Sequence, residues 1–190
     1  EKDFVRFPKE LYRNDQNWIA PLDDEVEAVF IPSLNQAFRN GEAIRWILKD
    51  DDKKTIGRIA AFIDYIRSNS NNQPTGGIGY FEVIDNKQAA FMLFDTAKDW
   101  LASKGMQAMD GPINFGENDN NWGLLVEGFM KQGIGMPYNK KYYQAFFEDW
   151  GFKKYFEQYS YHRTLRGPDR KIVEFPSRMI KIADWLSKRP

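Results

Sequence analysis

A predicted strand, helix and strand between residues 78 and 110 limit the possible folds more than any other segment. Residues 78–84 (IGYFEVI) are rich in β-branched and aromatic side chains, which favours a strand. Apolar residues repeat at helical spacing over 90–101, and Gly105 supplies a C-terminal stop. Residues 106–110 are predicted as a second strand. Two strands joined by a helix pair in parallel through a right-handed crossover, so the sequence predicts an α/β sheet.

The N-terminal residues predict three short elements. Residues 4–13 alternate weakly and contain Pro8, which favours a short edge strand followed by a turn. Residues 23–30 begin with two aspartates and predict a short helix, stopped by Ile31-Pro32. Residues 33–40 predict a second helical segment or a loop.

A β-hairpin is the clearest local prediction. Its arms, 42–49 and 55–65, are β-branched and aromatic, and an Asp-rich turn separates them. Residues 67–77 (RSNSNNQPTGG) are of low complexity and are expected to be mobile at the surface. Asp85 is expected to cap the helix that follows, with Gln88 completing a variant of the capping box.

The C-terminal third predicts alternating elements. A helix is expected over 139–150, a strand over 153–164 and a linker over 166–170. A short strand over 172–175 and an amphipathic helix over 177–188 follow. The expected strand carries three tyrosines on one face: Tyr155, Tyr159 and Tyr161.

Composition excludes several classes of function. The chain has 190 residues, enough for one domain with or without an appendage, and 27 basic residues balance 27 acidic ones. A net charge of zero gives no electrostatic argument for nucleic acid or an anionic membrane as a partner. Cysteine is absent and His162 is the single histidine, which argues against a thiol nucleophile, a histidine zinc site or a Ser-His-Asp triad. The sequence contains no apolar run of membrane-spanning length and no signal-peptide pattern, so a cytoplasmic location is expected.

The stretch 110–152 (DGPINFGENDNNWGLLVEGFMKQGIGMPYNKKYYQAFFEDWGF) combines polar loops with an aromatic helix that ends in FFEDWGF. This ending resembles the last helix of the GNAT superfamily of N-acetyltransferases, where a Y-E-K-x-G-F-like pattern is common; Phe147 occupies the usual tyrosine position. The order of predicted elements over 4–165 also resembles that superfamily. The resemblance implies a GNAT-like mixed α/β fold, mostly antiparallel with helices on both faces, over 1–165, followed by a linker and helix over 166–190.

The loop GPINFGENDNNWGLLVEGF is similar to a little-characterised bacterial branch of the superfamily. Members of this branch often carry a second GNAT-like domain downstream. The expected partners are therefore a second domain or a second copy of the chain, together with a small-molecule or peptide amine as acceptor.

The resemblance implies acetyl-CoA or another acyl-CoA as cofactor. In the superfamily, backbone N–H groups between the fourth strand and the third helix hold the pyrophosphate, within a Gln/Arg-x-x-Gly-x-Gly/Ala pattern. The corresponding residues here lack glycine, and Asp85 adds negative charge, but the positive end of the helix dipole remains. The residues expected to bind the cofactor are Val83, Ile84, Asn86, Lys87 and Gln88.

Catalysis in this superfamily uses a base for the acceptor amine and an acid for the leaving thiolate. Glu82 lies where a family base can occur, on the same strand face as Tyr80; the alternative is an exposed residue or a partner for Arg58. Since Phe147 cannot donate a proton, Tyr142 or Tyr143 would serve as acid. The alternative is that both tyrosines pack the helix on the sheet.

Polar residues after the second strand of the crossover unit are candidates for acceptor binding. Amides there can orient a polar substrate, or they can stitch a loop to itself. The candidates are Asn114, Asn118, Asp119, Asn120 and Asn121, with Asp110 as a second acidic group or a turn residue. The implied function is acyl transfer to an amine from acetyl-CoA or a longer donor. A catalytically silent domain that binds a ligand or partner is the alternative.

Overall fold

The computed structural model describes residues 2–68, 73–116, 123–133, 135–161, 177 and 181. The chain separates into two compact units, 1–153 and 154–190. In the second unit, residues 154–161 have no regular secondary structure and Tyr155 and Tyr161 are exposed, so the predicted strand is wrong in this part. Alternation gives a strand only where a neighbouring strand pairs with it. The remainder of that prediction, His162 and residues 172–175 lie outside the described residues; Ser177 and Lys181 are helical.

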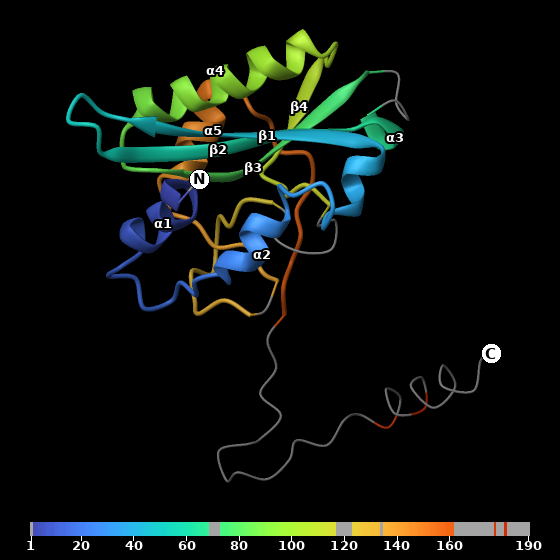
Figure 1. Ribbon diagram of the computed structural model, residues 1–190. Coiled ribbons are helices and arrows are strands. Elements are labelled where there is room, and N and C mark those ends of the chain that lie inside the picture. Colours follow the sequence, from blue (N-terminus) through green and yellow to red (C-terminus); the bar gives the residue numbers. More distant parts are fainter. Residues whose placement is uncertain are drawn as a thin grey trace, which may run out of the picture. The chain divides into compact units, whose positions relative to one another are not determined.

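Four strands form the sheet of the first unit, in the order β1-β2-β3-β4 (Figure 1). They are β1 (Gly41–Lys49), β2 (Thr55–Asp64), β3 (Thr75–Val83) and β4 (Ala108–Asp110). The first three are antiparallel neighbours, whereas β3 and β4 are parallel. The hairpin, the parallel pair and the mixed, mostly antiparallel α/β sheet are therefore confirmed.

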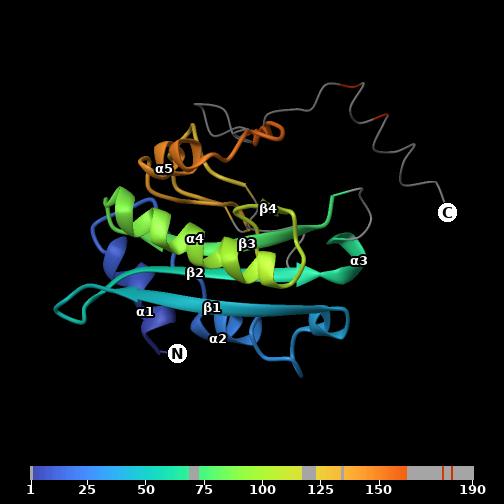
Figure 2. The ribbon, with the colours of Figure 1, turned by 90° about the horizontal axis from the view of Figure 1, so that it is seen from above.

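Helices cover both faces of this sheet, as predicted (Figures 1 and 2). On one face lie α4 (Lys87–Ser103) and α5 (Tyr143–Trp150), whose apolar side chains build the main core with β2 and β3. On the other face lie α1 (Lys2–Leu11) and α2 (Asp23–Ala28), packed over smaller clusters. Two short elements, η1 (Gln36–Arg39) and α3 (Tyr65–Ser68), flank the hairpin.

The N-terminal segment predicted as a strand is the helix α1. Its buried residues are Phe4, Val5, Phe7 and Pro8, a helical and not an alternating spacing. Pro8 has no N–H for the carbonyl of Phe4, four residues earlier. The Nη1 of Arg58 donates to that carbonyl at 2.6 Å instead. A side chain of the sheet therefore replaces the helix bond that Pro8 removes.

Strand β3 contains a β-bulge. Arg58 pairs with Glu82 and Ala60 pairs with Gly79, so three residues of β2 face four residues of β3. The extra residue allows Tyr80 a left-handed backbone, with φ of 48°. Such a conformation costs a non-glycine residue about 1–3 kcal/mol and persists where the surrounding structure enforces it.

Three predicted boundaries differ from the structure. Asn86, not Asp85, caps α4, because its side-chain oxygen accepts from the N–H of Ala89 at 3.0 Å. Helix α5 begins at Tyr143 and not at Asn139, whose side chain bonds both backbone groups of Leu125. The predicted low-complexity loop is shorter, because β3 already begins at Thr75; residues 69–72 lie outside the described part of the chain.

Candidate active site

The parallel strands β3 and β4 pair over only three residues and then separate. Their register joins Thr75–Gly77 to Ala108–Asp110, and a cis peptide bond follows at Gly111–Pro112. The N–H of Ile113 still donates to the carbonyl of Ile78 at 2.7 Å. Beyond that point β3 continues to Val83 without β4 beside it. The two strands therefore diverge beside the second half of β3.

Two tyrosines contact the end of β3: Tyr143, the first residue of α5, and Tyr142, its N-cap. The hydroxyl of Tyr143 accepts from the N–H of Val83 at 2.8 Å, and the hydroxyl of Tyr142 donates to the carbonyl of Val83 at 2.8 Å. Burial raises the pKa of both tyrosines, so both remain protonated at neutral pH. These hydroxyls hold the strand end, and a ligand that pairs with Val83 has to displace them.

Phe147, which the resemblance aligned with the acid of the GNAT superfamily, is a core residue. Its ring lies 4.8 Å from the ring of Phe94 and 5.2 Å from that of Phe81, and its side chain is buried. It packs α5 against α4 and β3 and has no proton to donate.

Glu82 forms an ion pair with Arg58, the alternative that the sequence left open. The Oε2 of Glu82 lies 2.5 Å from the Nε of Arg58, and the two side chains are 15% and 3% exposed. The guanidinium carbon also lies 4.5 Å from the centre of the Phe4 ring. Tyr80 and Glu82 share the α1 side of the sheet, as expected. Arg58 thus compensates the charge of Glu82 at Oε2.

The turn between β3 and α4 leaves backbone N–H groups available at the start of the helix. The N–H of Ile84 donates to the carbonyl of Ile56, and that of Asn86 donates to the carbonyl of Ile84. Within the described part of the chain, the N–H groups of Lys87 and Gln88 have no acceptor. They are the first donors of a 17-residue helix, where the dipole attracts anions.

The side chain of Lys87 is engaged at the surface. Its Nζ lies 2.8 Å from a carboxylate oxygen of Asp149, with both side chains half-exposed. Exposed ion pairs of this kind contribute at most about 1 kcal/mol. The lysine can therefore exchange Asp149 for a phosphate at little cost.

The predicted acceptor-binding residues divide into two groups. The side-chain oxygen of Asn114 accepts from the N–H of Tyr80 at 3.3 Å, which ties the loop to the β3 bulge. Asn118, Asp119, Asn120 and Asn121 lie outside the described residues. Asp110 ends β4 with an exposed side chain, and partial burial of its carboxyl raises its pKa.

Sequence reasoning missed Tyr12, a buried residue just beyond α1. The residue is 1% exposed, its ring stacks on that of Trp18 at 4.8 Å, and the Nζ of Lys140 lies 4.5 Å above it. A helical interpretation of this segment would have placed Phe4, Pro8 and Tyr12 on one face, at intervals of four. The weak alternation of the segment concealed this pattern.

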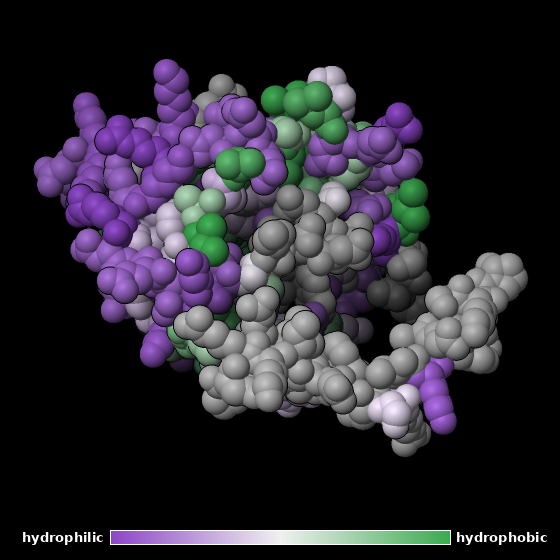
Figure 3. Space-filling model, turned by 90° about the horizontal axis from the view of Figure 1, so that it is seen from below, coloured by the Kyte–Doolittle hydropathy of each residue, from purple (hydrophilic) through white to green (hydrophobic). Residues whose placement is uncertain are grey.

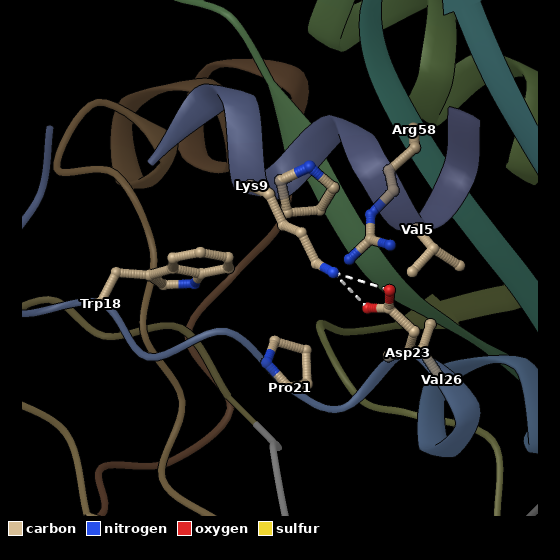
Figure 4. A pocket seen from close by; sticks show the side chains of 8 residues that line it. Val5, Lys9, Trp18, Pro21, Asp23, Val26 and Arg58 are labelled. Carbon is tan, nitrogen blue, oxygen red and sulfur yellow. Dashed lines mark hydrogen bonds and ion pairs between the residues drawn. The ribbon is translucent and has the colours of Figure 1, made fainter. Parts of the chain in front are cut away.

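A small hollow lies beneath α1, beside Arg58 (Figure 4). Its volume is about 10 Å³, room for one water molecule, so it cannot hold an acyl-CoA. The guanidinium of Arg58 lies beside the ion pair of Lys9 with Asp23, with Trp18 and Pro21 further along the wall (Figure 4). A wider polar hollow of about 250 Å³ lies between α1 and the β1–β2 turn, lined mainly by charged residues.

Among the described residues, no group of three or more His, Asp or Glu side chains is arranged to bind a metal ion. The same residues include no helix long and apolar enough to cross a membrane. On the face in Figure 3, hydrophilic residues predominate among the coloured ones and the hydrophobic ones stand in separate groups.

Comparisons with known proteins found two curated relatives and one solved structure, while no family model matches the chain. The chain is 34% identical over 154 residues to Protein YghO of Escherichia coli, a match covering 80% of this chain and 39% of that protein. It is 32% identical over 186 residues to the bacterial ceramide synthase of Caulobacter vibrioides, covering 95% of this chain and 46% of that protein. The chain thus spans less than half the length of the curated relatives that it matches. The solved structure is a putative acetyl transferase from Pyrococcus furiosus, with 12% identity, a TM-score of 0.47, and coverage of 85% of this chain and 93% of that one.

Proposed function

We propose that the chain is part of an N-acyltransferase that moves an acyl group from an acyl-CoA to an amine. The observation that carries the proposal is the pair of available N–H groups, Lys87 and Gln88, at the start of α4. They follow a bulged strand that has parted from its parallel neighbour. A pyrophosphate bound there would receive two backbone donors and the positive end of the helix dipole.

In the proposed reaction, the amine nitrogen attacks the thioester carbon and forms the C–N bond. The carbonyl oxygen takes up the negative charge, and its return expels the CoA thiolate as the C–S bond breaks. Glu82 accepts the proton of the amine through Oε1, since Arg58 contacts Oε2. Because a thiolate leaves readily, the step proceeds without an acid at Phe147, and the thiolate takes its proton from water.

The name of the second relative supports a finer proposal for the acceptor. A ceramide is the amide of a fatty acid with a long-chain amino alcohol, and 95% of this chain is covered by that match. We therefore propose a long-chain amino alcohol as the acceptor and a fatty acyl-CoA as the donor. Thiol release from acetyl-CoA and from palmitoyl-CoA, with sphinganine or a polyamine as acceptor, tests both choices.

Substitution of Lys87 tests the cofactor site. Asn86 has an extended backbone, with φ of −146° and ψ of 109°, which suits a residue before proline, and proline is favoured at the first helical position. Lys87→Pro thus removes the N–H with little strain, and Lys87→Gln removes only the charge. Losing a hydrogen bond to a charged group costs about 1.5–3 kcal/mol, so Lys87→Pro should bind CoA about tenfold to a hundredfold more weakly than Lys87→Gln. Equal affinities in calorimetry would reject these amides as the pyrophosphate site.

A catalytically silent ligand-binding or partner-binding domain is the second candidate. It is favoured by the hydroxyls of Tyr142 and Tyr143, which occupy both backbone groups of Val83. It predicts that neither CoA nor palmitoyl-CoA produces heat on titration into the wild-type protein. Saturable binding of either compound would exclude a domain that has lost its cofactor site.

A further inference from the structure

The hydroxyl of Tyr12 is buried without a hydrogen-bond partner in the described part of the chain. A buried polar group left unpaired costs about 1–3 kcal/mol, so native proteins rarely keep one without a role. Phenylalanine would fill the same space without this cost. The hydroxyl therefore calls for an explanation other than packing.

Tyr12 lies among the groups at the end of β3. Burial raises the pKa of Tyr12, the carboxylate of Glu82 raises it further, and the neighbouring hydroxyl of Tyr143 acts in the opposite direction. Tyr143 is thus a close neighbour, although its geometry falls outside that of a hydrogen bond. The hydroxyl of Tyr143 itself is engaged with the N–H of Val83. Tyr12 thus offers a hydroxyl without a hydrogen-bond partner among the described residues, close to Tyr143 and Glu82 at the end of β3.

We propose that the hydroxyl of Tyr12 donates a hydrogen bond to the carbonyl oxygen of the bound acyl group. This inference rests on the proposed function. A phenol that keeps its proton is suited to stabilise the oxygen that becomes negative when the amine attacks, and it does not surrender the proton. The stacked ring of Trp18 and the ammonium group of Lys140 hold the Tyr12 ring in place, so the donor is oriented before the ligand arrives. Tyr142 is the half-buried member of the group, and a ligand that takes the carbonyl of Val83 would have to displace its hydroxyl.

Tyr12→Phe removes only this hydroxyl. Acetyl-CoA has the acyl carbonyl and free CoA lacks it, so the variant should bind free CoA like wild type and acetyl-CoA about two- to tenfold more weakly. Thiol release should fall about 100- to 1000-fold, as for loss of one oxyanion donor. The thermal midpoint should stay equal or rise, because the removed group has no partner. Tyr143→Phe is the structural counterpart and should lower the midpoint; Tyr155→Phe, at an exposed position, should change nothing.

The outcomes separate this inference from the proposed function. If wild type binds neither CoA nor acetyl-CoA, the proposed function fails and the inference fails with it. If wild type binds both, but Tyr12→Phe keeps wild-type acetyl-CoA affinity and thiol release, only the role of Tyr12 is overturned. A midpoint that falls as far as in Tyr143→Phe would also overturn it, because the hydroxyl would then have a structural partner.

Discussion

Replacing Arg58 by methionine should destabilise the protein strongly. Among the polar side chains on the sheet face that α1 covers, we expect this replacement to cost the most stability. Arg58 is 3% exposed, lies 2.5 Å from Glu82 and donates at 2.6 Å to the Phe4 carbonyl that Pro8 leaves without a helix bond. Methionine keeps much of the volume but leaves a largely buried carboxylate without a cation. Breaking a buried ion pair from one side costs about 3–5 kcal/mol. Since Glu82 keeps 15% exposure and some water, the lower end of this range is expected.

The double variant Arg58→Met/Glu82→Met separates the charge effect from the packing effect. It removes both charges, so the cost remaining is the unpaired carbonyl of Phe4, about 1–3 kcal/mol. The double variant should therefore be more stable than Arg58→Met alone in urea unfolding followed by circular dichroism. A loss below about 1 kcal/mol for the single variant, or a double variant less stable than the single one, would refute this reasoning.

Three further predictions concern the sheet, the core and the N-terminal loop. Gly79→Ala places a Cβ 1.9 Å from the carbonyl oxygen of Ile113 and should cost about 3 kcal/mol or more in chemical unfolding, whereas Gly133→Ala meets only the flexible Met136 and should be nearly neutral. Phe147→Tyr buries a hydroxyl among the rings of Phe81 and Phe94, so it should lose about 1–3 kcal/mol of stability and gain no thiol-release activity, although it introduces the tyrosine that GNAT proteins usually have there. Burial raises the pKa of Asp15, but hydrogen bonds from Tyr138, Asn17 and Lys140 outweigh burial and lower it. This stabilisation is present above the unfolded-state pKa, near 3.8, and is lost as the pH falls below it. The wild-type protein should therefore lose its stability advantage over Asp15→Asn between about pH 5 and pH 3. An advantage that does not change with pH would contradict this prediction.

The sequence predicted the elements whose pattern is set locally. The hairpin arms and α4 have long, regular apolar periodicity, and the crossover rule supplied the parallel pairing of β4 with β3. Helix α1 was missed because Pro8 suggested an edge strand. Its helical state depends on Arg58, which lies 54 residues after Phe4 and donates to the Phe4 carbonyl that Pro8 frees. No local pattern contains that contact.

The candidate site was predictable in its position but not in its hydrogen bonds. The topology locates the β3–α4 turn, and the two-residue period put Tyr80 and Glu82 on one face. The engagement of Val83 by two phenols and the unpaired hydroxyl of Tyr12 depend on how α1 and α5 pack on β3. Such contacts arise between distant segments, and composition or spacing does not encode them in a recognisable way.

Titration of ¹⁵N-labelled protein with CoA, followed by amide resonances, tests the central claim most directly. The account predicts saturable shifts of the Lys87 and Gln88 amides, the available donors at the start of α4, with smaller changes at Val83 as the tyrosine hydroxyls are displaced. The claim would be contradicted if CoA binds while the resonances of these two amides stay unmoved. It would also be contradicted if CoA does not bind.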